Sequence, residues 1–198
     1  MLRAAAAAAG LFVLVAGCTA STSPAGVINS QTATAARTGP VISPPPVTPP
    51  TPPGDNLAAF ACKDVSGGKA GSANVTAVRA GEQTGFDRFV LQFDSQVPVY
   101  TIKRQTKTTF TQGASGQTIS VGGSSALLIT LHQAHQSGSY TGSTDIQHPD
   151  YAVFREAVVV QDFEGVVQWG IGLASPACIR AFTLSDPARL VIDFSTAT

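Results

Sequence analysis

Hydrophobic and polar residues alternate in short runs over the part of the chain that follows Leu57. In the run 89–93, the side chains of Phe89, Leu91 and Phe93 share one face of an extended chain, which is the period of a β-strand. Runs of the same character follow at 97–103, 126–131, 154–160, 167–173, 179–184 and 190–194. The run 154–160 is hydrophobic on both faces, as in a strand at the centre of a sheet.

Turn-forming residues separate these runs. The separators are rich in glycine: Gly67-Gly68, 113–116, Gly122-Gly123, Glu164-Gly165 and Asp186-Pro187. About seven to nine short strands with such turns, and no long run of helical spacing, predict an all-β domain, either an antiparallel β-sandwich or a barrel. The segment 133–151 is less regular, and we expect a long loop there.

Residues 1–17 have the composition of an export signal. Arg3 supplies the positive charge, and the hydrophobic segment after it is shorter than the roughly 20 residues that cross a bilayer. The sequence Leu-Val-Ala-Gly-Cys, which ends at Cys18, then resembles the lipobox of bacterial lipoproteins. The resemblance implies cleavage after Gly17, a diacylglyceryl group on the Cys18 sulfur and a further acyl chain, such as palmitate, on the new amino terminus. Ordinary signal-peptide cleavage, with a free Cys18 thiol, is the alternative.

A lipid on Cys18 changes the expected location of the protein. Two or more acyl chains hold a protein stably on a membrane, so we expect export and anchoring on the outer face of the cell membrane. Residues 18–57 are rich in Ser, Thr, Ala and Pro, and most of the 13 prolines lie at 40–53. This composition predicts a disordered tether with a polyproline II part about 40 Å long, which lifts the domain at 58–198 off the membrane. A docking site for a proline-recognising partner is the alternative.

The chain has three cysteines, an odd number for an exported protein. If Cys18 carries a lipid, Cys62 and Cys178 remain to pair in an oxidising compartment. We therefore expect a disulfide between Cys62 and Cys178, and two separately buried thiols are the alternative.

Charge excludes one class of partner. Charged residues make up 12% of the chain, about half the usual share, and the formal net charge is +0. Only Arg3, Arg37 and Asp55 lie before Leu57, so the β domain is itself nearly neutral. Binding of nucleic acid needs a basic surface that neutralises phosphates, and we expect no nucleic-acid partner.

Residues of catalytic or metal-binding type lack the arrangement that such chemistry needs. His132 and His135 follow a strand, in which residues three apart point to opposite faces, and no Cys or Glu cluster accompanies His148. Asp162 and Glu164 lie two apart at a strand end, as many acidic pairs do, without a second sign of a glycosidase cleft. We expect no catalytic residues, no cofactor and no metal. We therefore expect that the protein is not an enzyme.

Trp169 is the single tryptophan of the chain. It shares a strand face with Val167 and Ile171, so we expect it in the core rather than as a platform for stacking sugars. The opposite face of that strand carries Gly170 and Gly172, which permits the close approach of another layer or of a ligand, with packing as the preferred interpretation.

Polar side chains of the β domain give two further expectations. Arg88, next to Asp87, and Arg189, near Asp193, are placed to form structural ion pairs across neighbouring strands. If the domain has a polar binding surface, residue type favours two arginines and two tyrosines. These are Arg155, Tyr100, Arg104 and Tyr140.

Four motifs carry a family resemblance. They are GFDRFV at 85–90, FEGVVQWGIGL at 163–173, FTL at 182–184 and PARLVIDF at 187–194. Together they resemble the AMIN-like domain of actinobacterial lipoproteins, a relative of the AMIN domain that precedes the catalytic part of many cell-wall amidases. The resemblance spans about 75–194 and implies a non-catalytic β-sandwich that holds envelope proteins at peptidoglycan. It supplies no ligand-contact residues. No amidase part follows, so we expect the domain to act alone or through a partner.

Three hypotheses about function follow. The first is a lipid-anchored, non-catalytic envelope module that binds peptidoglycan or another wall polymer. The second is an adaptor or assembly lipoprotein that binds an envelope protein through an exposed strand edge or through the segment 133–151. The third is a β-sandwich with an internal cavity for a lipid or another small ligand.

Overall fold

The computed structural model describes residues 57–197, apart from residue 114. The expected signal sequence at 1–17, the expected lipid site Cys18 and nearly all of the expected tether lie outside the described residues, which form the β domain. Its described residues contain no helix of the length and hydrophobicity needed to span a membrane.

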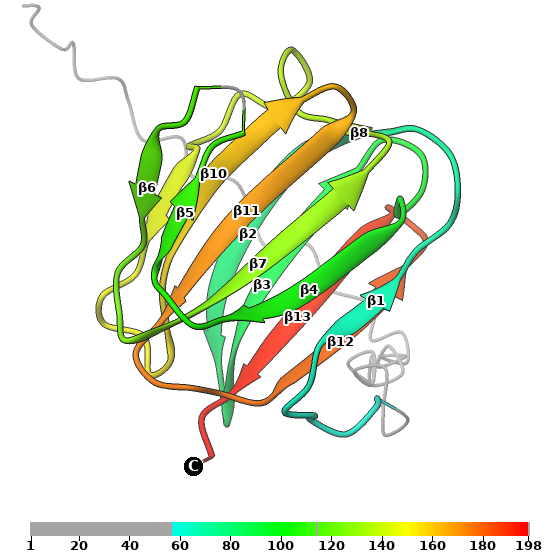
Figure 1. Cartoon of the computed structure of the whole chain (residues 1–198). Coiled ribbons are helices and arrows are strands. Elements are labelled where there is room, and N and C mark those ends of the chain that lie inside the picture. Colours follow the sequence, from blue (N-terminus) through cyan, green and yellow to red (C-terminus); the bar gives the residue numbers. More distant parts are fainter. Residues whose placement is uncertain (1–56, 114, 198) are drawn as a thin grey trace, which may run out of the picture. The chain divides into compact units, whose positions relative to one another are not determined.

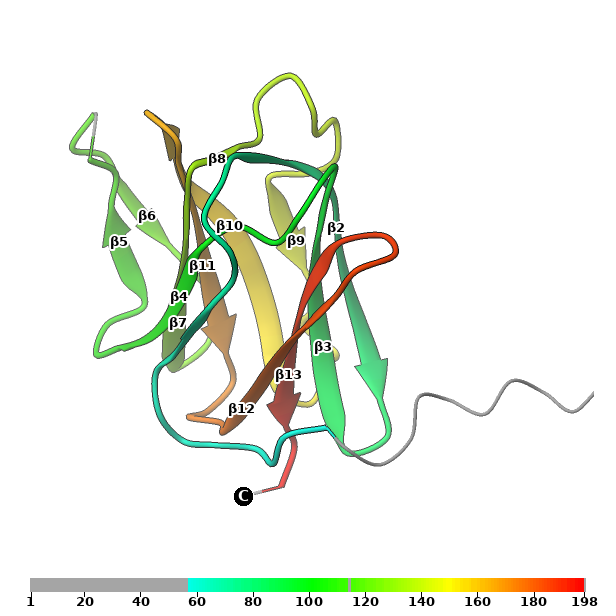
Figure 2. The ribbon, with the colours of Figure 1, turned by 90° about the vertical axis from the view of Figure 1, so that its right-hand side faces the viewer.

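Two β-sheets face each other and form a sandwich, which confirms the predicted fold class (Figures 1 and 2). The first sheet has six strands, in the order β1 (Val65–Gly67), β4 (Tyr100–Gln105), β7 (Ser125–His132), β11 (Val166–Leu173), β10 (Phe154–Phe163) and β9 (Asp145–Gln147). The second has five, in the order β12 (Ile179–Leu184), β13 (Arg189–Ser195), β3 (Phe86–Phe93), β2 (Ala73–Gln83) and β8 (Ala134–His135). Neighbouring strands are antiparallel except for β2 and β8, which are parallel.

The alternating hydrophobic residues meet between the sheets. Trp169 of β11 is fully buried there, which confirms its expected place in the core, and its Nε1 donates a hydrogen bond to the buried Gln136 side chain at 2.9 Å. Its ring packs against Phe89 of β3, in the other sheet. Burying such large aromatic side chains is the main favourable contribution to a fold of this kind.

A small hairpin covers the outside of the six-stranded sheet. It consists of β5 (Thr109–Thr111) and β6 (Thr118–Ser120), and Figure 2 shows it as a layer beyond the sandwich. Phe110 lies over Gly170, so closely that a Cβ atom at Gly170 would come within 2.5 Å of the phenylalanine ring. The bare glycine face of β11 is thus used for packing, as expected.

The local sequence pattern predicted seven strands, β3, β4, β7, β10, β11, β12 and β13, but missed β2 and the three-residue strands β1, β5 and β6. In β2 a β-bulge between Val75 and Ala77 shifts the register against β3, so the inward residues Val75 and Val78 are three apart rather than two. The expectation of a long loop at 133–151 was partly wrong, because the short strands β8 and β9 lie within it. Both strands have only two or three residues, too few for a periodic signal.

Residues 57–69, which we call the N-terminal strap, close one side of the sandwich. Ala61 pairs with Ile179 at the edge of the five-stranded sheet, and further along the strap β1 pairs with β4 of the other sheet. Cys62 and Cys178 form the expected disulfide, which joins residues 116 positions apart. The strap is therefore fixed to Ile179, at the start of β12, by two hydrogen bonds, and to Cys178, the residue before it, by the disulfide.

The interior gives no support to the hypothesis of an internal ligand cavity. The space between the sheets is filled by fully buried side chains, among them Phe93, Phe154 and Phe194. Three pockets on the described residues lie instead at strand edges, turns and loops.

Candidate functional site

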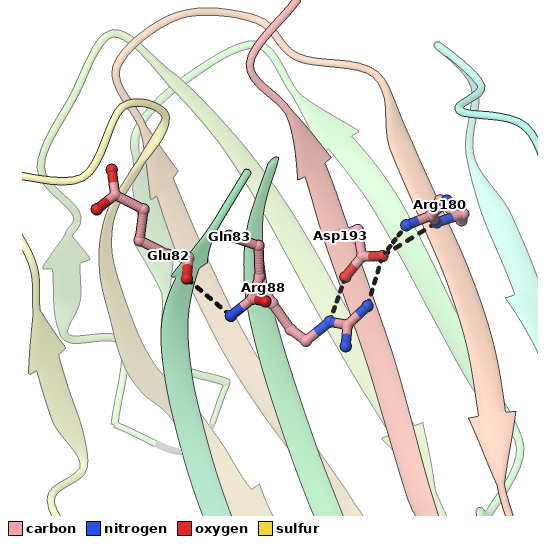
Figure 3. A network of polar contacts seen from close by, with 5 residues as sticks. All are labelled: Glu82, Gln83, Arg88, Arg180 and Asp193. Atoms are coloured by element: carbon pink, nitrogen blue, oxygen red, sulfur yellow. Dashed lines mark hydrogen bonds and ion pairs between the residues drawn. The ribbon is translucent and has the colours of Figure 1, made fainter. Parts of the chain in front are cut away.

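The outer face of the five-stranded sheet carries polar and aromatic side chains in ordered rows. Register places Arg180 of β12 opposite Asp193 of β13, and Asp193 opposite Arg88 of β3, so these three residues form one row across three strands. Their side chains point away from the core because their neighbours along each strand point into it. Figure 3 shows the row from close by.

Asp193 is the centre of this row. Its Oδ1 accepts a hydrogen bond from Arg88 Nε at 2.7 Å, and its Oδ2 accepts bonds from Arg88 Nη2 at 3.0 Å and from Arg180 Nε and Nη2 at 3.0 and 2.6 Å. The carboxylate is 0% exposed although it lies on the outer face, because the two guanidinium groups cover it. A buried carboxylate needs this degree of pairing to remain ionised without a large penalty.

Three phenylalanine rings surround the two arginines. The Arg180 guanidinium carbon lies 4.7 Å from the ring centre of Phe60 and 5.2 Å from that of Phe86. The Arg88 carbon lies 5.1 Å from Phe86 and 5.6 Å from Phe182. These distances are within the range of cation–π attraction, which holds the guanidinium planes in place. We call Phe60, Phe86, Arg88, Arg180, Phe182 and Asp193 the arginine–aromatic face.

The strap supplies one member of this face. Phe60 precedes Ala61, which pairs with Ile179, and the next residue forms the disulfide with Cys178. Arg180 follows Ile179 directly, so the same two links that fix the strap also place the Phe60 ring over the Arg180 guanidinium.

Two more arginines lie on the outer face of the same sheet. Arg79 of β2 is exposed and donates from Nη2 to Gln92 Oε1 at 2.7 Å, while Arg189 at the start of β13 donates from Nε to the Pro187 carbonyl at 3.2 Å. Arg88 thus pairs across neighbouring strands, as expected, but Arg189 does not reach a carboxylate.

Asp87 has a different role from the one expected beside Arg88. Adjacent residues of a strand point to opposite faces, so Asp87 is turned into the core. Its Oδ2 accepts hydrogen bonds from the backbone N–H groups of Val153 and Phe154 at 2.7 and 2.8 Å. Asp87 therefore ties β3 to the start of β10.

The four residues proposed from residue type are not brought together. Tyr100 and Arg104 belong to β4 and Arg155 to β10, and β7 and β11 lie between those strands. Tyr100 is 4% exposed, so it lies in the core and not on a polar binding surface, and burial raises the pKa of its hydroxyl. Tyr100 shares its face of β4 with the buried Ile102, two residues further along, and this face packs into the core.

The other three make local contacts. Arg104 Nη2 donates to the Ala177 carbonyl at 2.7 Å, and Arg155 donates to the Tyr151 carbonyl. Tyr140 packs edge-on against Trp169 and donates its hydroxyl to the Ser143 carbonyl, while partial burial raises its pKa. Each of these side chains thus has a structural partner.

The acidic and histidine candidates are also dispersed. His148 stacks on Tyr151 with ring centres 4.2 Å apart, and Asp162 accepts hydrogen bonds from the Ser137 backbone N–H and hydroxyl. Glu164 forms a two-residue turn with Gly165, both with positive φ, between β10 and β11. Among residues 57–197 without 114, no three His, Cys, Asp or Glu side chains gather as ligands for a metal ion.

The phase of the aromatic residues along the strands is a signal in the sequence for this face. Phe86 lies three residues before Phe89 and therefore falls on the polar face of β3, together with Arg88. In β12, Arg180 and Phe182 are likewise two residues apart, so an arginine and a phenylalanine again share the polar face of a strand. An aromatic residue in the polar phase of a strand is a candidate for a surface contact.

The comparison with known families agrees with the fold and with the motifs. Residues 73–196 match the AMIN-like domain, a stretch that includes every strand of the two sheets except β1. No curated protein matches the chain. The chain therefore belongs to the AMIN-like domain family.

Proposed function

We propose that this protein is a non-catalytic module of the cell envelope that binds peptidoglycan or another wall polymer through the arginine–aromatic face. The observation that carries the proposal is the row Arg180–Asp193–Arg88 with phenylalanine rings around it, on an outer sheet face. Membership of the AMIN-like family supports a wall-directed role.

The shape and chemistry of this face suit a long polymer. A sheet face is open along its length, so a glycan strand can lie across several β-strands without entering a cleft. Half-buried phenylalanine rings such as Phe86 and Phe182 offer apolar surface to the C–H groups of sugars. Guanidinium groups add directional N–H donors for hydroxyl, carboxylate or phosphate oxygens.

Anchoring is part of the same proposal. A lipid on Cys18 would hold the chain on the outer face of the cell membrane, and the proline-rich residues 40–53 would provide a spacer of about 40 Å. The domain could then reach the wall polymer while the protein stays attached to the membrane. Labelled palmitate should enter the wild-type protein and should not enter a Cys18→Ala variant.

The binding proposal is tested by sedimentation with purified cell-wall sacculi. A soluble form that starts at residue 19 should sediment with the sacculi, and Phe182→Ala should weaken this binding about threefold to tenfold because it removes one stacking ring. Phe163→Ala is the matched control, because Phe163 is 51% exposed at the end of β10 in the other sheet. Wild-type protein that remains in the supernatant would contradict the proposal.

A second candidate function rests on the edge of β2. The strand β8 pairs with β2 only at Ala73 and Asn74, so residues 76–83 have no neighbouring strand on that side among the described residues. A groove beside this edge is lined by 76–80 and by residues of the segment that contains Tyr140, Ile146 and His148. An extended segment of an envelope protein could add to this edge.

The two candidates give different results after the wall polymer is digested. A partner held at the β2 edge should remain crosslinked to the protein after lysozyme treatment, and Ala80→Pro should abolish the crosslink because proline cannot donate to an added strand. A crosslink that disappears on digestion favours the wall polymer instead.

A further inference from the structure

The charges of the arginine–aromatic face do not balance. Two guanidinium groups, on Arg88 and Arg180, share the single carboxylate of Asp193. Both oxygens of this carboxylate are occupied, with three of the four hydrogen bonds on Oδ2. One positive charge therefore remains uncompensated at the centre of the face.

The same two arginines retain unused hydrogen-bond donors. Each guanidinium bonds Asp193 through Nε and Nη2, and the Nη1 atoms have no hydrogen-bond partner within the described residues. The Arg88 side chain is 31% exposed and that of Arg180 is 14% exposed, so a ligand can reach both. Arginine presents its donors in a fixed plane that matches the two oxygens of a carboxylate or phosphate.

Neutralising Asp193 does not require both arginines. One bidentate arginine is sufficient for a carboxylate, and a second, partly buried guanidinium costs desolvation free energy. Cation–π attraction to the phenylalanine rings offsets this cost. It also fixes the Arg180 guanidinium between Phe60 and Phe86. The fold thus keeps an extra cation rigidly in place, which is the arrangement of a prepared anion site.

Two further side chains on the outer face around the row are also positively charged. Arg79 and Arg189 lie on this face, and neither forms an ion pair within the part of the chain that the structure describes. This concentration is notable in a chain whose formal net charge is +0. Exposed charge of one sign raises the local concentration of ligands of opposite sign.

We infer that the arginine–aromatic face recognises an anionic group of the wall polymer, a carboxylate or a phosphate, which Arg88 and Arg180 bind together. This inference rests on the proposed function and names the class of its ligand. A carboxylate would come from the peptide stems of peptidoglycan, and a phosphate from a phosphodiester polymer attached to the wall. A neutral glycan alone would leave the extra charge unpaired.

Three wall fractions and one neutral glycan distinguish the sources of the anion. The soluble form binds untreated sacculi, sacculi with carboxylates converted to amides, sacculi stripped of phosphodiester polymers, and chitin as a neutral glycan. We expect negligible binding to chitin, and a loss of about tenfold or more on amidation if the anion is a carboxylate or on stripping if it is a phosphate. Binding to sacculi should also weaken as the salt concentration rises.

Substitutions of Arg88 and Arg180 test whether these two residues bind the anion. Arg88→Gln and Arg180→Gln each leave Asp193 paired with the other arginine, so both should fold, and thermal unfolding checks this. Each should lose about tenfold or more in affinity for untreated sacculi. Lys103→Gln removes the same charge from an exposed position on β4, in the other sheet, and should bind like the wild type.

A soluble probe separates failure of the inference from failure of the proposed function. Muramyl dipeptide and glycerol phosphate should shift the NMR signals of the Arg88 and Arg180 Nε–H groups, whereas chitotriose should not. If these shifts occur but no wall fraction is bound, the anion site stands and the wall-binding function fails. Equal binding to chitin and sacculi, or wild-type affinity in both arginine variants, would overturn the inference.

Discussion

At Asp193, a carboxylate that is 0% exposed meets two guanidinium groups from neighbouring strands. The charge of this one side chain holds the outer row of three strands together. Removing one partner of a buried ion pair leaves an uncompensated charge, which is more costly than losing the whole pair.

Asp193→Asn should lower the free energy of unfolding by about 3 kcal/mol, because Arg88 and Arg180 would then face each other without an anion. Urea unfolding measures the loss. Asp150→Asn, at an exposed position, is the control and should stay within about 0.5 kcal/mol of the wild type. Similar midpoints for both variants would show that the row contributes little to stability.

Glu156 gives the domain a second electrostatic feature, at the opposite sheet. Burial raises the pKa of Glu156 above its ordinary value of 4.5, and the nearby Asp145 carboxylate adds to this increase, while the hydrogen bond from the Gly122 N–H opposes it. The folded state therefore favours the protonated form. The resulting stability is complete below the unfolded pKa and is lost as the pH rises through the folded pKa.

Glu156→Gln, which mimics the protonated form at every pH, should be more stable than the wild type at pH 7 and about equally stable below pH 4. Paired urea titrations from pH 3.5 to 7 measure this difference directly. A constant difference across the range would contradict the raised pKa.

Among the elements, the N-terminal strap links stability to the candidate site. The strap is joined to the start of β12 through the pairing of Ala61 with Ile179, and to the residue before β12 through the Cys62–Cys178 disulfide. It also brings Phe60 to Arg180. Loss of the disulfide should therefore affect both the whole fold and the local geometry of the face.

A Cys62→Ala, Cys178→Ala double variant should lose about 2–4 kcal/mol of unfolding free energy, because the long loop closed by the disulfide regains entropy in the unfolded chain. It should also bind sacculi more weakly under conditions where it remains folded. Phe60→Ala, which keeps the disulfide, should lose binding with little change in stability. If the double variant binds fully, the strap has no part in the site.

At the scale of the whole molecule, the sequence predicted the fold better than the site. Strands such as β3 and β11 were predictable because each carries its own hydrophobic period, and β2 was missed because a bulge disrupts that period. The row of Arg88, Arg180 and Asp193 depends on which strands become neighbours. Arg88 and Asp193 are 105 residues apart, and nothing in either local pattern specifies their register.

The arginine–aromatic face draws its members from both ends of the domain. Phe60 and β3 come early in the described chain, and β12 and β13 come last. Until β13 has docked between β12 and β3, the two arginines lack their shared counter-ion, Asp193. On the proposed function, a polypeptide in which β13 has not yet paired with β12 and β3 lacks the assembled face and cannot bind the wall polymer.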